Sequence, residues 1–381
     1  MISNNSPFRF EILHQSKKSR ARVGKIHTPH GIIDTPNFVA VGTNSTIKAL
    51  DSVIVDQLGV QLMFCNSYHL ILQPGVQVIK AAGGLHRFMN RKQPIITDSG
   101  GFQVFSLAYG SVADELKSRG QKKETNNSVL KINEDGVLFR SYRDGSKVLL
   151  TPETSVQAQK DFGADIIIPF DELPPYHIAK EELKASFDRT HRWEKRSLDE
   201  HLKSPNNQAM YAVIHGGIDR DLRLESIQIL SQLAFDGFSI GGSIGKTRDE
   251  MFQLLHELAP SLPPGYPVHL LGIGDLPSLA GSIPFGIDTF DSSFPTKAAR
   301  HGHLFSPQGI VRLKQSIHAK DFSPIDPECQ CPTCLQYTKG YLHHLFKASE
   351  LTFYTLATIH NIHFMVQLMK SYREKILRDE V

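Results

Sequence analysis

Three cysteines close together are the first residues whose type and spacing suggest chemistry. Cys329, Cys331 and Cys334 lie within six residues, in the pattern Cys-x-Cys-x2-Cys. Three thiolates on one tight turn favour zinc, and a single histidine would complete a closed, structural, tetrahedral site. The downstream candidates for the fourth ligand are His343, His344, His360 and His363. Spacing alone leaves the choice among these four open.

The remaining cysteine and the Cys331-x2-Cys334 pair suggest other readings. A Cys-x-x-Cys pair has redox spacing, but this one lies outside any predicted βαβ unit and has Cys329 two residues before it. Metal binding accounts for all three thiols. Cys65 lies in an apolar run, and we expect it to be an unreactive thiol in the core.

Aspartates near the ends of short apolar runs form the second chemically useful group. Asp98 and Asp171 each follow such a run, and the last run carries Asp288 and Asp291. Carboxylates that meet at one mouth can supply a nucleophile and a general acid/base. Paired glycines after neighbouring runs, such as Gly241 and Gly242, let a flat ligand lie against the backbone.

Two other interpretations of these acidic residues remain open. A single aspartate after a strand often caps the next helix. Carboxylates together with His69 or His215 could also hold a metal ion at the same mouth. A third motif, Gly245-Lys246-Thr247, ends like a phosphate-binding loop, but the required glycine is replaced by Ile240, which excludes that reading.

The elements that must position these residues alternate between strand and helix. Eight short runs rich in β-branched and aromatic residues predict strands at 37–42, 61–65, 94–97, 165–170, 209–214, 237–240, 267–271 and 287–290. Helical periodicity lies between them at 50–58, 75–82, 151–162, 178–203, 220–235, 247–259 and 276–283. Eight buried strands joined by crossover helices favour a (β/α)8 barrel, with its site at the carboxyl ends of the strands.

Two regions depart from the alternation. The segment 107–150 is too long for one connection and contains three strand-like stretches with turns, which predicts a small antiparallel insertion. After residue 294 the alternation stops, and a long helical stretch follows the cysteines. We therefore expect a barrel domain over 1–300 and a mainly helical zinc-binding subdomain over 301–381.

Composition sets limits on function. The 381 residues carry 42 Lys and Arg against 39 Asp and Glu, a net charge of +3, so overall charge does not indicate a polyanionic partner. A positive excess is local, with six basic residues and one acidic residue in 1–30 and eleven against seven in 295–381. No run reaches the length of a membrane helix or resembles a signal peptide, and we expect a cytoplasmic protein.

Four motifs in this order resemble those of the tRNA-guanine transglycosylase family, in its bacterial form. The motifs are Asp98-Ser99-Gly100-Gly101-Phe102-Gln103-Val104-Phe105, Phe170-Asp171-Glu172, Phe290-Asp291 with Pro295-Thr296, and Cys329-x-Cys331-x2-Cys334-x25-His360. The resemblance covers essentially the whole chain. It implies a (β/α)8 barrel with a zinc subdomain and selects His360 as the fourth zinc ligand.

The resemblance also implies an activity and a set of residue roles. Guanine at the wobble position of a tRNA anticodon would be exchanged for a 7-deazaguanine base, with Asp291 as nucleophile and Asp98 as general acid/base. Lys297 and Arg300 would contact the anticodon loop, and a homodimer is usual among bacterial members. The residues expected to bind the base are Ser99, Phe102, Gln103, Asp171, His215 and Gly242. Because the chain ends at Val381, we expect an enzyme of the anticodon class rather than one acting on the tRNA core.

Two departures from the family pattern bear on the base. His215 stands where bacterial members have a glutamine, so its ring offers one hydrogen bond in place of an amide's donor and acceptor. The phrase G-G-L-A-V-G-E is shortened by one residue here, and Lys246 replaces its acid. A lysine would repel the cationic 7-aminomethyl-7-deazaguanine, so we expect the finished base, queuine, to be preferred.

Two other functions compete with this interpretation. The family includes non-catalytic tRNA-binding subunits, but both Asp98 and Asp291 are present here. A barrel glycosidase would use the same carboxylates, but it needs aromatic platforms for sugars, and the one tryptophan, Trp193, is predicted to lie in a helix.

Overall fold

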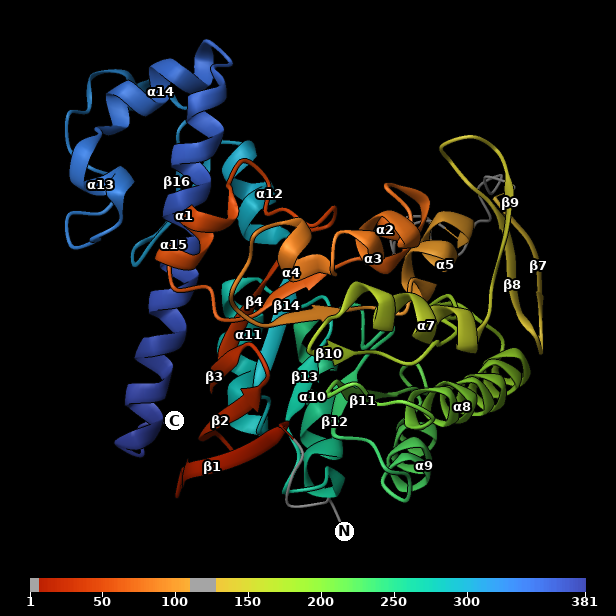
Figure 1. Ribbon diagram of the computed structural model, residues 1–381. Coiled ribbons are helices and arrows are strands. Elements are labelled where there is room, and N and C mark those ends of the chain that lie inside the picture. Colours follow the sequence, from red (N-terminus) through yellow and green to blue (C-terminus); the bar gives the residue numbers. More distant parts are fainter. Residues whose placement is uncertain (1–6, 110–127) are drawn as a thin grey trace.

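Eight parallel strands close into a barrel at the centre of the molecule (Figure 1). The structure, a computed structural model, describes residues 7–109 and 128–381. In barrel order the strands are β4 (Asn37–Val41), β5 (Met63–Cys65), β6 (Ile95–Thr97), β10 (Ile166–Ile167), β11 (Ala209–Ile214), β12 (Gly237–Ile240), β13 (Val268–Leu270) and β14 (Thr289–Ser292). All eight predicted strands are confirmed, although β10 is shorter than expected. Because β14 pairs in parallel with β4, every carboxyl end lies on one rim, here called the mouth.

Helices surround the barrel and mostly begin at the mouth. The helices that correspond to the predicted helical segments are α1 (Ser52–Gln57), α3 (Val76–Ala81), α7 (Pro152–Phe162), α8 (Lys180–Leu202), α9 (Arg220–Leu230), α10 (Arg248–Leu258) and α11 (Leu276–Ser282). Local sequence sets their ends: α7 starts with a capping box between Thr151 and Thr154 and stops at Gly163, which has φ 70°. The short helices α2 (Ser67–Leu72), α4 (Leu85–Phe88) and α5 (Gly101–Tyr109) were not predicted.

A three-stranded antiparallel sheet closes the amino end of the barrel. Its strands are β1 (Arg9–Gln15), β2 (Arg22–Thr28) and β3 (Gly31–Thr35). Ile26 and Ile33 are fully buried in one cluster with Val39, Phe64 and Val213 of the barrel strands. The sheet therefore plugs the barrel at the end opposite the mouth.

The insertion after β6 forms a second antiparallel sheet, as predicted. It consists of β7 (Val129–Asn133), β8 (Gly136–Arg140) and β9 (Lys147–Leu150); residues 110–127 of the predicted insertion lie outside the described residues. Phe139 packs on Tyr68, with ring centroids 5.4 Å apart, and Trp193 of α8 donates a hydrogen bond to Glu134 O at 2.9 Å. The sheet therefore packs against elements that carry mouth residues.

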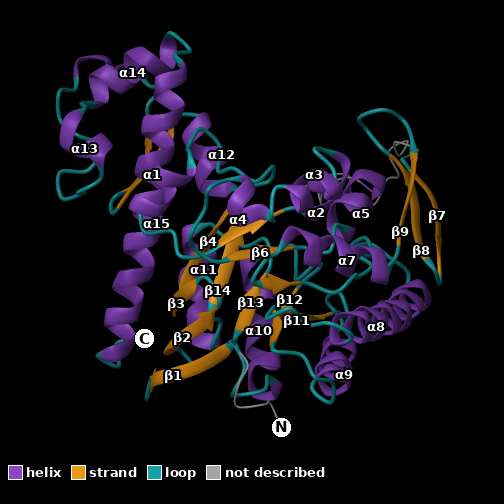
Figure 2. Cartoon of the chain, viewed as in Figure 1, coloured by secondary structure: helices purple, strands orange, loops and turns teal. Residues whose placement is uncertain are grey.

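The C-terminal part is mainly helical (Figure 2). It contains α12 (Phe294–Arg300), the hairpin β15 (His303–Ser306) and β16 (Gly309–Arg312), α13 (Pro332–Gln336), α14 (Lys339–Lys347) and α15 (Leu351–Leu377). The 27-residue α15 runs back along the barrel and contacts β4, β2 and β1. Ser19 Oγ donates to Val381 O at 3.0 Å, so the chain end is fastened to the N-terminal sheet. The domain boundary at residue 300 stays a prediction.

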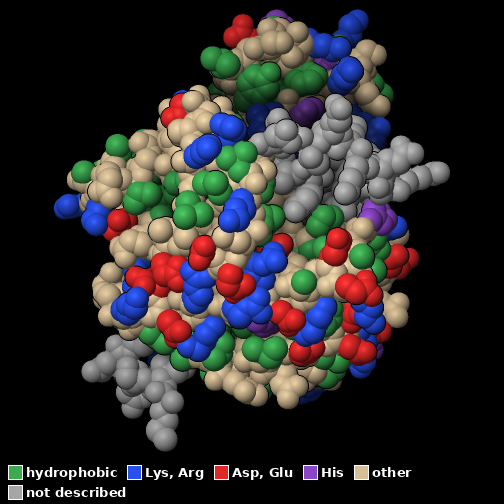
Figure 3. All heavy atoms as spheres, turned by 90° about the vertical axis from the view of Figure 1, so that its right-hand side faces the viewer, with side chains coloured by type: hydrophobic (Ala, Val, Ile, Leu, Met, Phe, Trp, Pro, Cys, Tyr) green, Lys and Arg blue, Asp and Glu red, His purple; other side chains and the backbone are tan. Residues whose placement is uncertain are grey.

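Charges on the flank formed by α8 and α9 are largely paired. Figure 3, which faces this side, shows Lys and Arg side chains interspersed with Asp and Glu. The pairs here include Lys184 with Asp188, Arg192 with Glu134, Lys195 with Asp199 and Arg196 with Glu153. This flank offers no continuous positive patch to a polyanion. Among the described helices, none has a stretch of the length and hydropathy that crossing a membrane requires.

Candidate active site and metal centre

Asp98 lies directly after β6 and is buried at the mouth. Its carboxylate accepts hydrogen bonds from Asn66 Nδ2 and the Ser67 backbone N–H, both at 2.7 Å, and from the Gly100 N–H at 3.2 Å. Burial raises the pKa of Asp98 to about 6, although these donors and Gln103 lower it in part. A carboxyl that titrates near neutral pH can both donate and accept a proton.

Asp291 lies within β14, and its carboxylate is also buried. Its Oδ1 accepts a hydrogen bond from the Gly272 N–H at 2.8 Å and lies 3.1 Å from His269 Nε2. His269 Nδ1 lies 2.8 Å from the Thr289 hydroxyl, which fixes the ring. Both contacts are made by Oδ1, and no hydrogen bond within the described chain involves Oδ2. That oxygen is available as a nucleophile.

Asp171 meets the loop after β6 through Ser99. Ser99 Oγ donates to Asp171 Oδ1 at 2.9 Å. A Cβ at Gly101 would come within 2.6 Å of Asp171 O, so this close approach needs glycine. Phe102, in the first turn of α5, has 49% of its surface exposed, which leaves its ring free to stack on a flat ligand.

The loops after β11 and β12 are held together by a buried arginine. Arg223, fully buried on α9, donates to Gly217 O at 2.9 Å and to Ser243 O at 3.2 Å, and also to Ile214 O. Burial lowers its pKa to about 9. The three carbonyls flank His215 and Gly242, and Gly242 is exposed with φ 75°. Arg223 therefore fixes two of the predicted base-binding positions relative to each other.

One predicted mouth residue is placed elsewhere. Asp288 precedes β14 rather than following it, so it lies at the amino end of the barrel. Its carboxylate accepts hydrogen bonds from Arg22 Nε at 2.9 Å, Arg22 Nη2 at 2.6 Å and the Val268 N–H at 2.7 Å. The expectation that Asp288 joins Asp291 at the mouth was wrong, because the strand spans 289–292 rather than the predicted 287–290, which leaves Asp288 before its amino end.

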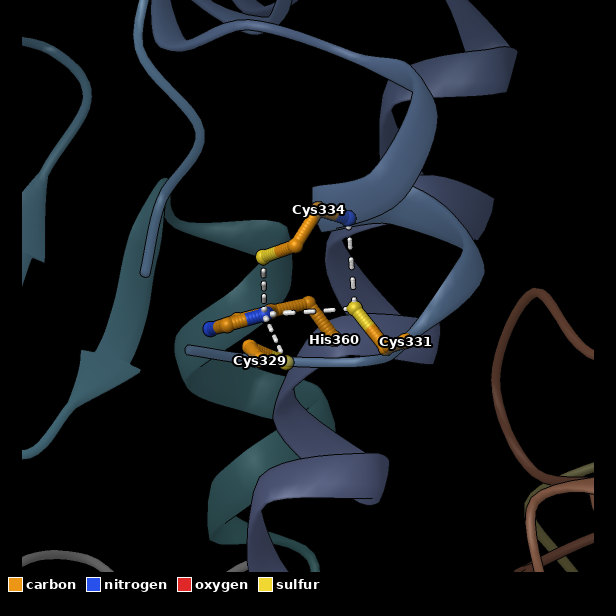
Figure 4. A group of neighbouring side chains, drawn as sticks. All are labelled: Cys329, Cys331, Cys334 and His360. Carbon is orange, nitrogen blue, oxygen red and sulfur yellow. Dashed lines mark hydrogen bonds between the residues drawn. The ribbon is translucent and has the colours of Figure 1, made fainter. Parts of the chain in front are cut away.

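The three cysteines and His360 form a compact cluster (Figure 4). His360 Nδ1 lies 3.8, 3.5 and 3.3 Å from the sulfurs of Cys329, Cys331 and Cys334. A tetrahedral zinc ion with Zn–S near 2.3 Å and Zn–N near 2.05 Å separates sulfur and nitrogen by about 3.6 Å. His360 Nε2 lies 2.6 Å from Phe305 O, which directs Nδ1 at the sulfurs. The cluster can hold a metal ion with this ligand set.

A second group of possible ligands lies at the amino end of the barrel. His30 Nδ1 and His86 Nε2 lie 2.8 and 3.2 Å from the two carboxylate oxygens of Asp165. The two imidazoles stack with centroids 3.5 Å apart and planes 14° apart, and the ligand atoms of the three residues lie within 4.8 Å of one another. Asp165 also accepts the Ile95 N–H at 2.8 Å. His86 Nε2 has no hydrogen-bond partner in the described residues. In the described residues no such group lies at the mouth, so a mouth metal has no support.

The whole sequence agrees with one known family. A model of the queuine tRNA-ribosyltransferase family matches residues 16–381. The chain belongs to the queuine tRNA-ribosyltransferase family. It is 67% identical to a queuine tRNA-ribosyltransferase of Protochlamydia amoebophila, over 98% of this chain and 96% of that protein. It is 56% identical to that of Chlamydia caviae, over 98% and 99% of the two chains. The resemblance read from the four motifs is confirmed.

The two departures from the family pattern have distinct environments in this family member. His215 Nε2 lies 3.1 Å from Asp171 Oδ2, so the histidine and the aspartate predicted to bind the base are in contact. Lys246 Nζ lies 4.8 Å from the centre of the Tyr176 ring, and its backbone N–H donates to Glu250 Oε2 at 2.7 Å. Lys246 is exposed beside the mouth rather than paired with an acid through its ammonium group.

The cationic residues predicted to contact RNA lie on α12, which follows β14 at the mouth. Lys297 is exposed, and Arg300 lies one turn later and is partly buried. Arg300 Nη1 is a buried nitrogen with no hydrogen-bond partner in the described residues. The guanidinium therefore keeps a donor that no described residue uses.

Sequence reasoning missed several residues of this family member's mouth. Asn66 and Ser67 hold Asp98, but polar residues after a strand do not by themselves indicate such a partner. His269 was hidden in an apolar run, and Arg223 and Glu194 lie on helices whose charged residues suggest a solvent-exposed face. A histidine inside a barrel strand was the one available signal, since its side chain must point to the core or the mouth.

Proposed function

We propose that the mouth of this tRNA-guanine transglycosylase is its catalytic site, with Asp291 as nucleophile and Asp98 as general acid/base. The enzyme is a pentosyltransferase, and the glycosidase and non-catalytic alternatives find no support among its relatives. The observation that carries the assignment is the pair of buried carboxylates on one rim. Burial raises the pKa of Asp98 to about 6, and within the described residues Asp291 Oδ2 makes no hydrogen bond.

The reaction then takes two displacements at the same carbon. The Asp291 carboxylate attacks C1′ of the wobble nucleotide, the bond between C1′ and the guanine nitrogen breaks, and Asp98 gives its proton to the departing guanine. The incoming 7-deazaguanine loses its ring N–H proton to Asp98 and attacks C1′, and Asp291 leaves. Two inversions retain the configuration of the ribose.

The base would be extruded from the anticodon loop and enclosed by residues that follow four strands, β6, β10, β11 and β12. Phe102 stacks on the ring, and Asp171 accepts hydrogen bonds from the donor edge of the base. Ser99 holds Asp171 at 2.9 Å. The remaining proposed contacts to the base come from Gln103, His215 and the Gly242 backbone N–H.

We assign the metal of the Cys3His cluster as zinc, held by Cys329, Cys331, Cys334 and His360. The sulfur–nitrogen separations of 3.3–3.8 Å agree with the tetrahedral value of about 3.6 Å. Four protein ligands leave no open position, so the metal's part is to stabilise the fold of the C-terminal region rather than to activate water. Lys297 and Arg300 provide phosphate contacts to the anticodon loop. A homodimer and a cytoplasmic location, where tRNA is found, complete the proposal.

A direct assay tests the exchange. Purified enzyme should incorporate radiolabelled guanine into unmodified tRNA carrying guanosine at the wobble position. Asp291→Ala and Asp98→Ala should abolish incorporation. Asp236→Asn, at the amino end of the barrel, is the matched control and should retain it. Full exchange by Asp291→Ala would refute the assignment.

The preference for queuine rests on Lys246. An exposed ammonium beside the mouth repels a cationic aminomethyl group, and the loop that carries Lys246, one residue shorter than the family phrase, leaves more room for the larger substituent of queuine. We expect Lys246→Glu to raise kcat/KM for 7-aminomethyl-7-deazaguanine about tenfold relative to queuine, since a charge reversal at close range changes binding by about 1 kcal/mol or more. Lys246→Met separates loss of repulsion from gain of attraction. A wild-type preference for the aminomethyl base would contradict the proposal.

A further inference from the structure

Glu194 is a carboxylic acid buried without a cation beside it. It lies on α8, its side chain is fully buried, and its Oε2 accepts the Val213 N–H at 3.3 Å. Its Oε1 is buried and has no hydrogen-bond partner among the described residues. Other acidic residues of α8, such as Asp188 and Asp199, are half exposed and paired with lysine. An unpaired acid in the core is costly, so its presence calls for a reason.

The unpartnered oxygen of Glu194 is directed at a residue of the base site. Glu194 Oε1 lies 3.9 Å from His215 Nε2, and the same nitrogen lies 3.1 Å from Asp171 Oδ2. The other titratable or charged groups around His215 are Glu172, paired with Arg189, and the buried His191 and Arg223. His215 is therefore placed between two carboxyl groups, one at the mouth and one in the core.

The chemistry of the base explains why a second acid is useful. A neutral imidazole has one N–H. If Nδ1 carries it and donates to a carbonyl oxygen of the base, Nε2 is left as a bare acceptor 3.1 Å from the Asp171 carboxylate, which repels it. A protonated imidazole donates from both nitrogens. Burial and the nearby Asp171 carboxylate raise the pKa of Glu194 well above its usual value, which favours the protonated carboxyl.

We propose that Glu194 is a positioning residue that stores the proton His215 needs to bind the base. When the base binds, the proton moves from the Glu194 carboxyl to His215 Nε2, leaving Glu194 ionised and His215 a donor both to Asp171 and to the carbonyl oxygen of the base. The net charge of Asp171, His215 and Glu194 is unchanged by this transfer. Base binding then needs no proton from solvent. The inference rests on the proposed base site.

The test is equilibrium dialysis of radiolabelled guanine against enzyme without tRNA, between pH 6.5 and 8.5. Wild-type affinity should change little over this range. In Glu194→Gln, which keeps the acceptor for Val213 N–H, the proton must come from solvent, and affinity should fall about tenfold per pH unit at the alkaline end. Glu200→Gln, on the same helix but paired at the surface with Lys203, should behave as wild type.

A double-variant cycle separates this role from a structural one. His215→Gln removes the group that receives the proton, so adding Glu194→Gln to it should leave the pH dependence unchanged. A Glu194→Gln variant whose pH profile of guanine binding matches wild type overturns the inference. So does a Glu194→Gln substitution that changes this pH profile equally in the wild-type and the His215→Gln backgrounds. His215→Gln alone should give flat binding, and a steep profile in that variant also overturns it. Failure of the wild type to bind guanine at any pH refutes the base site and the inference with it.

Discussion

Replacing the general acid should make the protein more stable while abolishing its activity. Burial raises the pKa of Asp98 from 3.8 to about 6. In the unfolded chain the same carboxyl ionises near 3.8, so a proton is easier to lose on unfolding. The stability that protonated Asp98 contributes is present below pH 3.8 and is lost as the pH rises through 6. A difference of about two pKa units corresponds to about 3 kcal/mol at pH 8.

Asp98→Asn removes this penalty because an amide does not ionise. The variant should be more stable than wild type by about 3 kcal/mol at pH 8, and by about 2 kcal/mol less at pH 4.5. With an unfolding entropy of roughly 2.1 cal/mol/K per residue, a 381-residue chain should gain about 4 °C in Tm at pH 8. Differential scanning calorimetry of both metal-loaded proteins at one scan rate measures the difference.

Asp236→Asn is the matched control. Burial also raises the pKa of Asp236 to about 6, but this residue precedes β12 at the amino end of the barrel and accepts the Met210 N–H at 2.9 Å. It should show the same pH-dependent stabilisation and keep full guanine exchange. An Asp98→Asn variant that is no more stable than wild type at pH 8, or a stability difference that does not depend on pH, would refute the reasoning from burial.

The remaining predictions concern the metal and the RNA. Elemental analysis of the purified protein should find one zinc ion per chain. Cys331→Ser should remove the zinc and lower Tm by several degrees, and treating the wild type with a strong chelator should have the same effect. A metal-free protein of unchanged Tm would contradict the structural role of the metal. Lys297→Gln with Arg300→Gln should raise KM for tRNA about tenfold with kcat within twofold, and should flatten the dependence of KM on salt, because phosphate contacts release counterions. An unchanged salt slope would place the RNA elsewhere.

The sequence predicts the barrel well because buried parallel strands read as continuous apolar runs. The bounds predicted for β11 and β12 agree with the structure. The N-terminal sheet could not be predicted, because the strand Arg9–Gln15 mixes exposed charged and apolar residues and has no repeat to mark it. Its role as a plug depends on Ile26 and Ile33 meeting the barrel core, which is a tertiary contact.

The site shows the same limit at the level of single residues. Asp98, Asp171 and Asp291 could be placed at the mouth because each lies at or just after the carboxyl end of its strand, whereas Asp288, three residues before Asp291, lies at the opposite end. Glu194 lies in the sequence His-Arg-Trp-Glu-Lys-Arg, which has the composition of a solvated helix, and it is buried only because that face of α8 packs on β11. Partnerships across elements, such as Glu194 with His215, are not encoded in local spacing.

The nucleophilic role of Asp291 has one direct test. Enzyme mixed with substrate tRNA, denatured and separated by electrophoresis should give a covalent protein–RNA adduct, and mass spectrometry of its peptides should place the ribosyl group on Asp291. Guanine added before denaturation should reverse the adduct and release the tRNA, and Asp291→Asn should form no adduct. An adduct on Asp98, or guanine exchange by Asp291→Asn at the wild-type rate, would contradict the central claim.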